Sequence, residues 1–245
     1  MRRLQTRREA RHEAGVFVLE GTRSAEEALA AGVTARLVLH TPDPEPRAAA
    51  IVQAFSERGS EVLAVTPRIL EACSDHVTPP GLLIVVDRPK LPIPASLSLA
   101  LVADGLADPG NLGSLMRTCV AAGVEAMFLM PGSVDPYNPK VVRGGMGAHF
   151  RLPIETLADG PASPSLSGLE IWLAAAWDGT VYHQVDWRKP TALVVGSEAR
   201  GGDPAWRARA SGVARIPMRP GIDSLNAAVA AGVILFEVAR QRGSP

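Results

Sequence analysis

Short apolar runs alternate with helical hydrophobic patterns along the whole chain. In one of the helical patterns Leu112, Leu115, Met116 and Cys119 recur at i, i+3, i+4 and i+7, which is the spacing of one buried helix face. The strand-like runs are 16–19, 37–39, 61–65, 82–86, 99–103, 126–130, 171–175, 193–195 and 214–216. This alternation predicts an α/β fold with mostly parallel strands.

Several helix boundaries can be predicted from local signals. Residues 24–27 (Ser-Ala-Glu-Glu) match a capping box and predict a helix that ends at Gly32. Further helices are expected over 46–58 and just after Thr66-Pro67. The last helix is predicted from about Ser224 to about Arg240, and it is apolar almost all round. Such a helix is buried in a large core or against another subunit.

A proline-containing stretch, residues 88–94, separates two groups of these elements. Linkers between domains commonly have this composition. We therefore expect two domains, residues 1–91 and residues 92–245.

Composition limits the function classes. The chain has 245 residues, 47% hydrophobic and 20% charged, and its 25 basic and 25 acidic residues give a formal net charge of +0. This balance excludes a basic tail and an acidic disordered chain, so any nucleic-acid binding must be local. Cys73 and Cys119 lie in separate segments, which suggests neither a disulfide framework nor a zinc site. No secretory or membrane-spanning run is evident, so we expect a cytoplasmic protein without membrane or metal.

Common catalytic motifs are missing from the sequence. It contains no GxxxxGK[ST], HExxH, GxSxG or complete GxGxxG pattern, which disfavours nucleotide hydrolysis, zinc proteolysis and esterase chemistry. The five histidines are scattered, and we assign none of them a role.

Three polar, glycine-containing loops follow predicted strands. They cover residues 108–113 with Arg117 beyond them, residues 196–201, and residues 216–226. Ligands of open α/β sheets bind outside the carboxyl ends of the strands. We therefore expect these loops to lie close together.

The three loops resemble the motifs of the SpoU/TrmH branch of the SPOUT RNA methyltransferases. Asn111-x-Gly113-x-x-x-Arg117 is similar to the first motif, 195–201 (Val-Gly-Ser-Glu-x-x-Gly) to the second, and 216–218 (Ile-Pro-Met) through 224–226 (Ser-Leu-Asn) to the third. Residues 137–153 are similar to the segment between the first two motifs. Residues 7–21 resemble the start of a substrate-binding domain that is similar to ribosomal RNA-binding folds.

This resemblance implies a C-terminal SPOUT domain with a parallel sheet and a trefoil knot, which periodicity cannot show. It also implies an obligate homodimer and methyl transfer from S-adenosylmethionine to a ribose 2′-hydroxyl of RNA, with rRNA favoured over tRNA. The implied catalytic residues are Asn111, Arg117, Glu198, Ser224 and Asn226. The implied cofactor-binding residues are Val195, Gly196, Ser197, Glu198, Gly201, Ile216, Met218, Ser224, Leu225 and Asn226.

Each of these residues also has an ordinary structural interpretation. Arg117 lies off the apolar stripe of its helix, where a solvated arginine is common. The resemblance implies that it activates the 2′-hydroxyl, but a guanidinium group holds its proton, so orienting the hydroxyl is physically easier than abstracting its proton. Asn111 is equally well explained as a helix N-cap, and Ser224 and Asn226 resemble an N-cap and a first-turn residue. Ala199 stands where the second motif usually has glycine, which puts the geometry of that loop in doubt.

RNA contacts are expected from basic residues in two segments. Arg7, Arg8 and Arg11 near the N-terminus form a candidate phosphate-binding patch, although a disordered solvated arm explains them equally well. Lys140 and Arg143 belong to the similar intervening segment.

Two other classes of function stay open. One is a non-catalytic RNA-binding protein that keeps the fold, and the other is a dinucleotide-dependent enzyme, against which the missing GxGxxG counts. A tRNA-directed methyltransferase and an rRNA methyltransferase that confers antibiotic resistance are variants of the main hypothesis.

Overall fold

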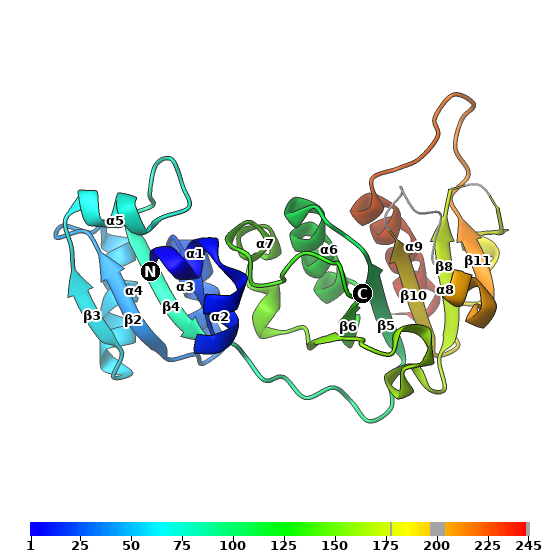
Figure 1. Cartoon of the computed structure of the whole chain (residues 1–245), viewed down its shortest axis with the longest axis horizontal. Coiled ribbons are helices and arrows are strands. Elements are labelled where there is room, and N and C mark those ends of the chain that lie inside the picture. The colour runs from blue at the N-terminus through cyan, green and yellow to red at the C-terminus, as the bar shows by residue number, and fades with distance from the viewer. Residues whose placement is uncertain (177, 197–203, 244–245) are drawn as a thin grey trace. The chain divides into compact units, whose positions relative to one another are not determined.

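The computed structural model describes residues 1–176, 178–196 and 204–243, which separate into two compact units (Figure 1). The first unit contains Met1–Lys90 and Asp135–Arg151, and the second contains Leu91–Val134 and Leu152–Pro245. The segment Asp135–Arg151 was expected to belong with the C-terminal part, but its contacts place it in the first unit. The division into an RNA-binding and a methyltransferase domain stays a prediction.

The first unit is built on a four-stranded sheet of order β1-β4-β2-β3. Its strands are β1 (Val16–Glu20), β2 (Ala35–His40), β3 (Glu61–Ala64) and β4 (Leu82–Asp87). Only β2 and β3 pair in parallel, while β4 is antiparallel to both β1 and β2. The expectation of mostly parallel strands is therefore wrong for this unit. A hydrophobic run has the same appearance in either direction, so strand direction depends on the connections.

The helices of the first unit cover this sheet. They are α1 (Arg2–Thr6), α2 (Arg8–Ala14), α3 (Thr22–Ala30), α4 (Pro46–Glu57), α5 (Pro67–Cys73), α7 (Pro139–Gly145) and the short 3₁₀ helix η1 (Ala148–Phe150). The N-terminal segment is thus helical rather than a disordered arm. Gln5 ties it down, because its Nε2 donates to Glu20 Oε1 at 2.6 Å and to the Cys73 carbonyl at 3.1 Å.

The expected capping box at Ser24 is not formed. Helix α3 begins at Thr22, after Gly21 with φ 85°, and no side chain caps it, so Ser24 lies inside the helix. The glycine conformation provides the turn into the helix in place of a side-chain cap.

The segment Asp135–Arg151 packs into the first unit through buried polar and aromatic contacts. Arg11 donates to Asp135 Oδ2 from Nε at 2.9 Å and from Nη2 at 2.6 Å. The rings of Tyr137 and His149 lie 5.2 Å and 5.5 Å from the ring of Phe17. These interactions join the segment to α2 and β1.

The second unit contains a seven-stranded sheet of order β7-β6-β5-β10-β8-β11-β9, and every adjacent pair is parallel. The strands are β5 (Leu99–Asp104), β6 (Ala126–Leu129), β7 (Ile154–Thr156), β8 (Glu170–Ala175), β9 (Thr180–Val181), β10 (Thr191–Gly196) and β11 (Gly212–Arg215). The α/β class and parallel sheet are as predicted here. The edge strands β7 and β9 escaped sequence analysis because each is only two or three residues long.

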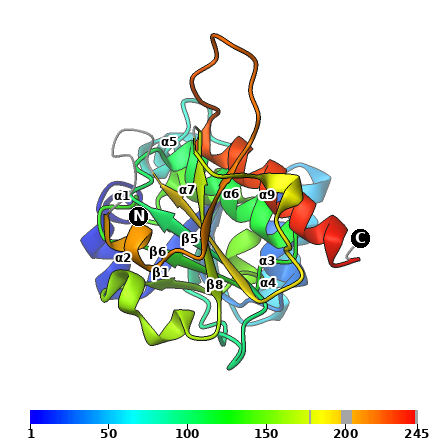
Figure 2. The same cartoon turned by 90° about the vertical axis from the view of Figure 1, so that its right-hand side faces the viewer.

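Helices α6 (Pro109–Ala121), α8 (Pro204–Arg209) and α9 (Ala227–Gln241) belong to this unit, with 3₁₀ helices η2 (Gly160–Ala162), η3 (Pro164–Leu166) and η4 (Tyr182–Gln184). Helices α6 and α9 pack closely, since a Cβ on Gly232 would lie 3.5 Å from Thr118 Cγ2. Figure 2 shows the orange segment between β11 and α9 as a long loop that extends away from the sheet.

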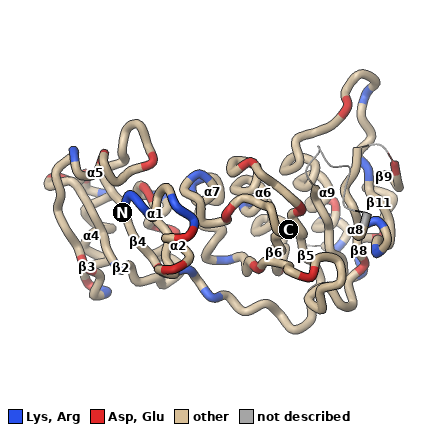
Figure 3. The backbone as a smooth tube through the Cα atoms, in the orientation of Figure 1, with Lys and Arg blue, Asp and Glu red and all other residues tan. Residues whose placement is uncertain are grey.

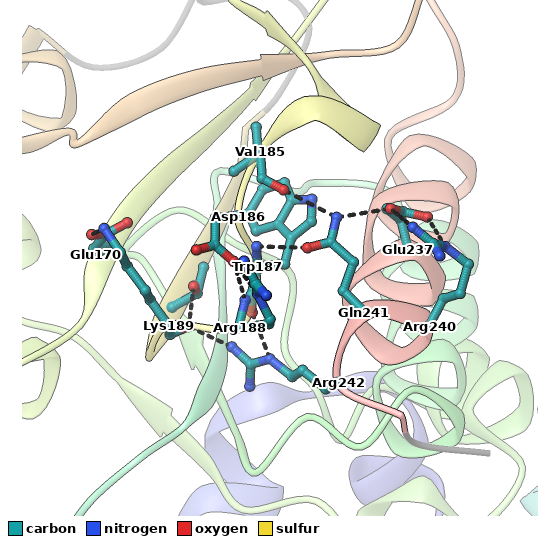
Figure 4. Close-up of polar contacts among 11 residues, drawn as sticks. Glu170, Val185, Asp186, Trp187, Arg188, Lys189, Glu237, Arg240, Gln241 and Arg242 are labelled. Atoms are coloured by element: carbon teal, nitrogen blue, oxygen red, sulfur yellow. Dashed lines mark hydrogen bonds and ion pairs between the residues drawn. The ribbon is translucent and has the colours of Figure 1, made fainter.

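The carboxyl end of α9 is fixed to the chain that precedes β10 (Figure 4). Gln241 Oε1 accepts from the Trp187 amide at 3.0 Å, and its Nε2 donates to the Val185 carbonyl at 3.0 Å. Arg242 donates to the carbonyls of Trp187 and Lys189 at 2.7 Å and 2.6 Å. These bonds hold α9 in place along the sheet.

Candidate functional site

A cavity of about 330 Å³ lies at the carboxyl edge of the sheet of the second unit. Its wall includes the ends of β8 and β10, the segment after β11 and the first turns of α9. Six residues expected to hold a cofactor line it: Val195, Gly196, Ile216, Met218, Ser224 and Leu225. The volume is within the roughly 300–1,000 Å³ typical of small-molecule sites.

The parallel register explains why these residues meet. Gly196 is the last residue of β10 and pairs with Asp104, the last residue of β5. A Cβ at Gly196 would lie 3.9 Å from the Asp104 carbonyl oxygen, so the two strand ends approach closely. Because adjacent parallel strands end at the same edge, segments distant in sequence share one cavity wall.

The first and third sequence motifs are joined by a side-chain hydrogen bond. Asn226 Nδ2 donates to Asn111 Oδ1 at 2.7 Å. Asn226 Oδ1 accepts from the amides of Ala228 and Val229 at 2.9 Å and 3.3 Å, which makes Asn226 the N-cap of α9. Helix α9 therefore begins at Ala227 rather than near Ser224, and Ser224 is an exposed loop residue in the cavity wall.

Asn111 is not the N-cap of its helix. That position belongs to Asp108, whose Oδ1 accepts from the Asn111 amide at 2.7 Å. The side chain of Asn111 is left to bond Asn226, and its Nδ2 makes no hydrogen bond with the described residues. The N-cap interpretation of Asn111 is therefore wrong.

Arg117 lies six residues along α6 from Asn111 and is exposed. Within residues 1–176, 178–196 and 204–243 its guanidinium makes no hydrogen bond or ion pair. A surface arginine without a partner is available to bind an anionic ligand. Ser197, Glu198 and Gly201 of the second motif, together with Ala199, lie outside the described residues.

Comparisons with known proteins agree with this arrangement. Residues 98–236 match the SpoU rRNA Methylase family model. The chain belongs to the SpoU rRNA methylase family. The resemblance drawn from its three motifs is thereby confirmed, and the family match covers the cavity and Asn111, Arg117 and Asn226.

Relatives of this SpoU family member extend over nearly its whole length. An uncharacterized tRNA/rRNA methyltransferase of Synechocystis is 32% identical over 240 residues, covering 95% of this chain and 86% of the relative. The 23S rRNA (guanosine(2553)-2′-O)-methyltransferase RlmP of Bacillus subtilis is 27% identical and covers 97% and 93%. The crystal structure of the SpoU methyltransferase AviRb of Streptomyces viridochromogenes with AdoMet superposes with a TM-score of 0.85 at 28% identity, covering 99% and 96%.

The basic residues expected to bind RNA all lie in the first unit of this SpoU methylase, where residues 1–83 match an MRM3-like substrate binding domain model. Figure 3 shows Lys and Arg on α1, α2 and α7. Arg7, Arg8, Lys140 and Arg143 are exposed. Arg143 also contacts His76 Nε2 at 3.1 Å and Asp75 Oδ2 at 3.7 Å.

Arg11 does not belong to that exposed set. It is 2% exposed, its Nε and Nη2 bind Asp135, and its Nη1 donates to the Leu4 and Gln5 carbonyls at 2.7 Å and 3.3 Å. Its expected role as a phosphate contact is corrected to a structural one. Sequence spacing cannot distinguish it from Arg7 and Arg8, because its acidic partner is 124 residues away.

Sequence analysis missed four polar residues in the cavity wall: Asp104, Trp206, Arg207 and Asp223. Asp104 had a usable signal, since it directly follows the strand predicted over 99–103 and ends β5 in the structure. Trp206 and Arg207 had no such signal, because no sequence pattern indicates that helix α8 packs against the cavity.

Residues 1–176, 178–196 and 204–243 contain no cluster of three or more His, Cys, Asp or Glu side chains suited to a metal ion. The helices within these ranges are also too short or too polar to cross a membrane.

Proposed function

We propose that this protein methylates a ribose 2′-hydroxyl of ribosomal RNA with S-adenosylmethionine as methyl donor. The observation that carries the proposal is the cavity at the carboxyl edge of the parallel sheet. Residues of the second and third motifs line it, and the Asn226–Asn111 hydrogen bond connects the third motif to the first.

The residues of the cavity fit an adenosyl cofactor. Val195, Ile216 and Leu225 provide apolar surface for a flat base, while Gly196 leaves the backbone accessible. Asp104, Asp223 and Arg207 add charges of both signs, which suits a ligand carrying ammonium, sulfonium and carboxylate groups. When bound, S-adenosylmethionine supplies a methyl group on a positively charged sulfur.

Catalysis then depends on how the chain holds the attacking hydroxyl. Arg117 is assigned to orient the ribose and its neighbouring phosphate, because a guanidinium donates several hydrogen bonds in a fixed geometry. Asn111 Nδ2 is a second donor, and Asn226 keeps Asn111 in position. Ser224 lies at the cavity wall to contact cofactor or substrate. On the family resemblance alone, Glu198 is assigned to hold Arg117 or the cofactor loop in position.

The first unit is proposed to bind the RNA through Arg7, Arg8, Lys140 and Arg143. Few aromatic side chains accompany them, which favours contacts with the phosphate backbone over base stacking. Ribosomal RNA is preferred over tRNA because rRNA methyltransferases occur among the relatives. Residues 1–83 also match an MRM3-like substrate binding domain model.

We further propose the C-terminal trefoil knot, a cytoplasmic location and a homodimer. Support for the dimer comes from α9, where Val229, Val233 and Phe236 are 54%, 36% and 51% exposed. They recur at i, i+4 and i+7 and therefore form one apolar stripe on the helix surface. Stripes of this kind are buried in subunit interfaces.

The proposal is tested by two measurements on the purified full chain. Calorimetric titration with S-adenosylmethionine is expected to show saturable binding at one site per chain. Incubation with tritiated cofactor is expected to label deproteinised rRNA or ribosomal subunits, and not tRNA, at a nucleotide whose 3′ phosphodiester resists alkali. RNA binding without cofactor binding would instead support the non-catalytic alternative.

A further inference from the structure

One buried tryptophan in the cavity wall has an unused hydrogen-bond donor. Trp206 lies on α8, is 1% exposed and packs among buried residues that include Phe128 and Leu166. It also lines the cavity. Among the described residues its indole Nε1 has no hydrogen-bond partner.

The other two described tryptophans are different. Trp187 Nε1 donates to the Tyr182 carbonyl at 2.7 Å, and Trp172 Nε1 donates to Glu170 Oε2 at 3.3 Å. Buried indole N–H groups normally have such partners because an unpaired donor loses its hydration without compensation. The unpaired donor of Trp206 therefore points to an acceptor that the described residues do not supply.

We propose that Trp206 Nε1–H donates a hydrogen bond to the adenosyl part of the cofactor. This inference rests on the proposed function and assigns one chemical contact within it. Adenine offers ring nitrogens as acceptors in the plane of a flat apolar ligand. The surroundings of Trp206 within the cavity are likewise apolar, with Leu173, Val194 and Val213 in the same wall and the same core cluster.

The charged end of the cofactor is a poorer partner for this donor. Ammonium and sulfonium groups offer no acceptor to an N–H, and a carboxylate is better matched by a cation than by a neutral indole. A contact to the adenosyl part has a distinct consequence, because S-adenosylmethionine and S-adenosylhomocysteine share that part. Loss of the donor weakens both ligands equally.

The test is calorimetric titration of both ligands into wild type, Trp206→Phe and Trp187→Phe. Phenylalanine keeps an aromatic ring and removes the N–H. Trp206→Phe is expected to weaken both ligands by about 3- to 10-fold, the effect of one neutral hydrogen bond, with the ratio of their affinities unchanged. Trp187→Phe makes the same change to a buried tryptophan outside the cavity wall, and ligand affinity is expected to stay at the wild-type value.

NMR of the tryptophan indole groups tests the same contact without substituting Trp206, so the result does not depend on whether Trp206→Phe folds. With ¹⁵N-labelled indoles, assigned by replacing the other three tryptophans in turn, the Trp206 Nε1–H resonance is expected to move downfield when S-adenosylhomocysteine binds. Analogues in which one adenine ring nitrogen is replaced by carbon identify the acceptor, because the analogue that lacks it leaves that resonance unmoved.

Two kinds of failure are distinguishable. If wild type binds both ligands while Trp206→Phe binds them equally well and the indole resonance does not move, the inference is overturned and the proposed function stands. A loss confined to S-adenosylmethionine overturns the assignment to the adenosyl part. If wild type binds neither ligand, the proposed function fails and the inference fails with it.

Discussion

Asn226 and Asn111 lie 115 residues apart in the chain and share a side-chain hydrogen bond of 2.7 Å. Its direction is determined by the surrounding bonds, because Asn226 Oδ1 already caps α9 and only its Nδ2 is left to donate. One side chain thus starts a helix and positions a residue of another helix. The two roles can be separated by substitution.

Asn226→Ala is expected to lose both roles and Asn226→Asp only the second, since aspartate also caps helices. Urea unfolding of the alanine variant is expected to show a loss of about 1 kcal/mol, with the aspartate variant close to wild type. Methyl transfer is expected to fall in both. Full activity of Asn226→Asp would show that donation from Asn226 Nδ2 to Asn111 Oδ1 is not needed for catalysis.

Arg117→Ala is expected to change stability by less than about 0.5 kcal/mol, because the side chain is exposed and unpaired among the described residues. Methyl transfer is expected to fall by about 100-fold or more, in the range of lost catalytic groups. Arg117→Lys keeps the charge but not the fork of donors, so it is expected to recover only part of the rate. Equal rates for wild type and alanine variant would remove Arg117 from the mechanism.

The buried Arg11–Asp135 pair predicts a stability effect at a position that sequence analysis placed in the RNA patch. Their side chains are 3% and 8% exposed. Asp135→Ala leaves a buried unpaired charge and is expected to cost about 3–5 kcal/mol in urea unfolding. The control Arg8→Ala, at an exposed position nearby in sequence, is expected to leave stability unchanged. It is expected to lower the slope of log affinity for RNA against log salt concentration by about one, the effect of one lost phosphate contact. The reverse pattern would return Arg11 to the RNA contacts.

His149 predicts a pH dependence of stability. Burial lowers its pKa to about 4, although its contact with the Pro136 carbonyl opposes the shift. The unfolded chain, with a histidine pKa of about 6.5, therefore binds a proton that the folded protein excludes. Stability is expected to be complete above pH 6.5 and to fall by up to about 3 kcal/mol as the pH drops to 4.

Urea unfolding at several pH values measures this effect. Phenylalanine suits a site beside the Phe17 and Tyr137 rings. In His149→Phe the fall in the free energy of unfolding between pH 6.5 and 4 that comes from His149 is expected to disappear. An unchanged slope in the variant would assign the pH dependence to other groups.

The apolar stripe on α9 predicts the oligomeric state. Light scattering at micromolar concentration is expected to give twice the chain mass for wild type and a monomer for Phe236→Glu, because the interface would then bury an unpaired charge. Leu63→Glu, at a comparably exposed position in the first unit, is expected to stay dimeric. A monomeric wild-type protein would contradict the proposed homodimer.

The sequence alone determined what depends on local pattern. Periodicity located nearly all the longer strands and helices, and composition located the three polar loops after the strands. The resemblance of these loops to the SpoU/TrmH motifs then named Asn111, Val195, Ile216 and Asn226 as candidates. Hydrophobic spacing and the glycines at strand ends depend on how each short segment folds. Ligands of parallel sheets bind at one edge of the sheet, so the position of the loops could be predicted without knowing any long-range contact.

Tertiary structure decided whatever depends on contacts between distant segments. It placed Asp135–Arg151 in the first unit and buried Arg11 against Asp135. It also made strand β4 antiparallel to its neighbours and brought Trp206 to the cavity wall. An arginine on a short helix has the same local sequence signal whether it faces solvent or a carboxylate 124 residues away. Its role is determined by chain packing, because burial and pairing are properties of the whole fold.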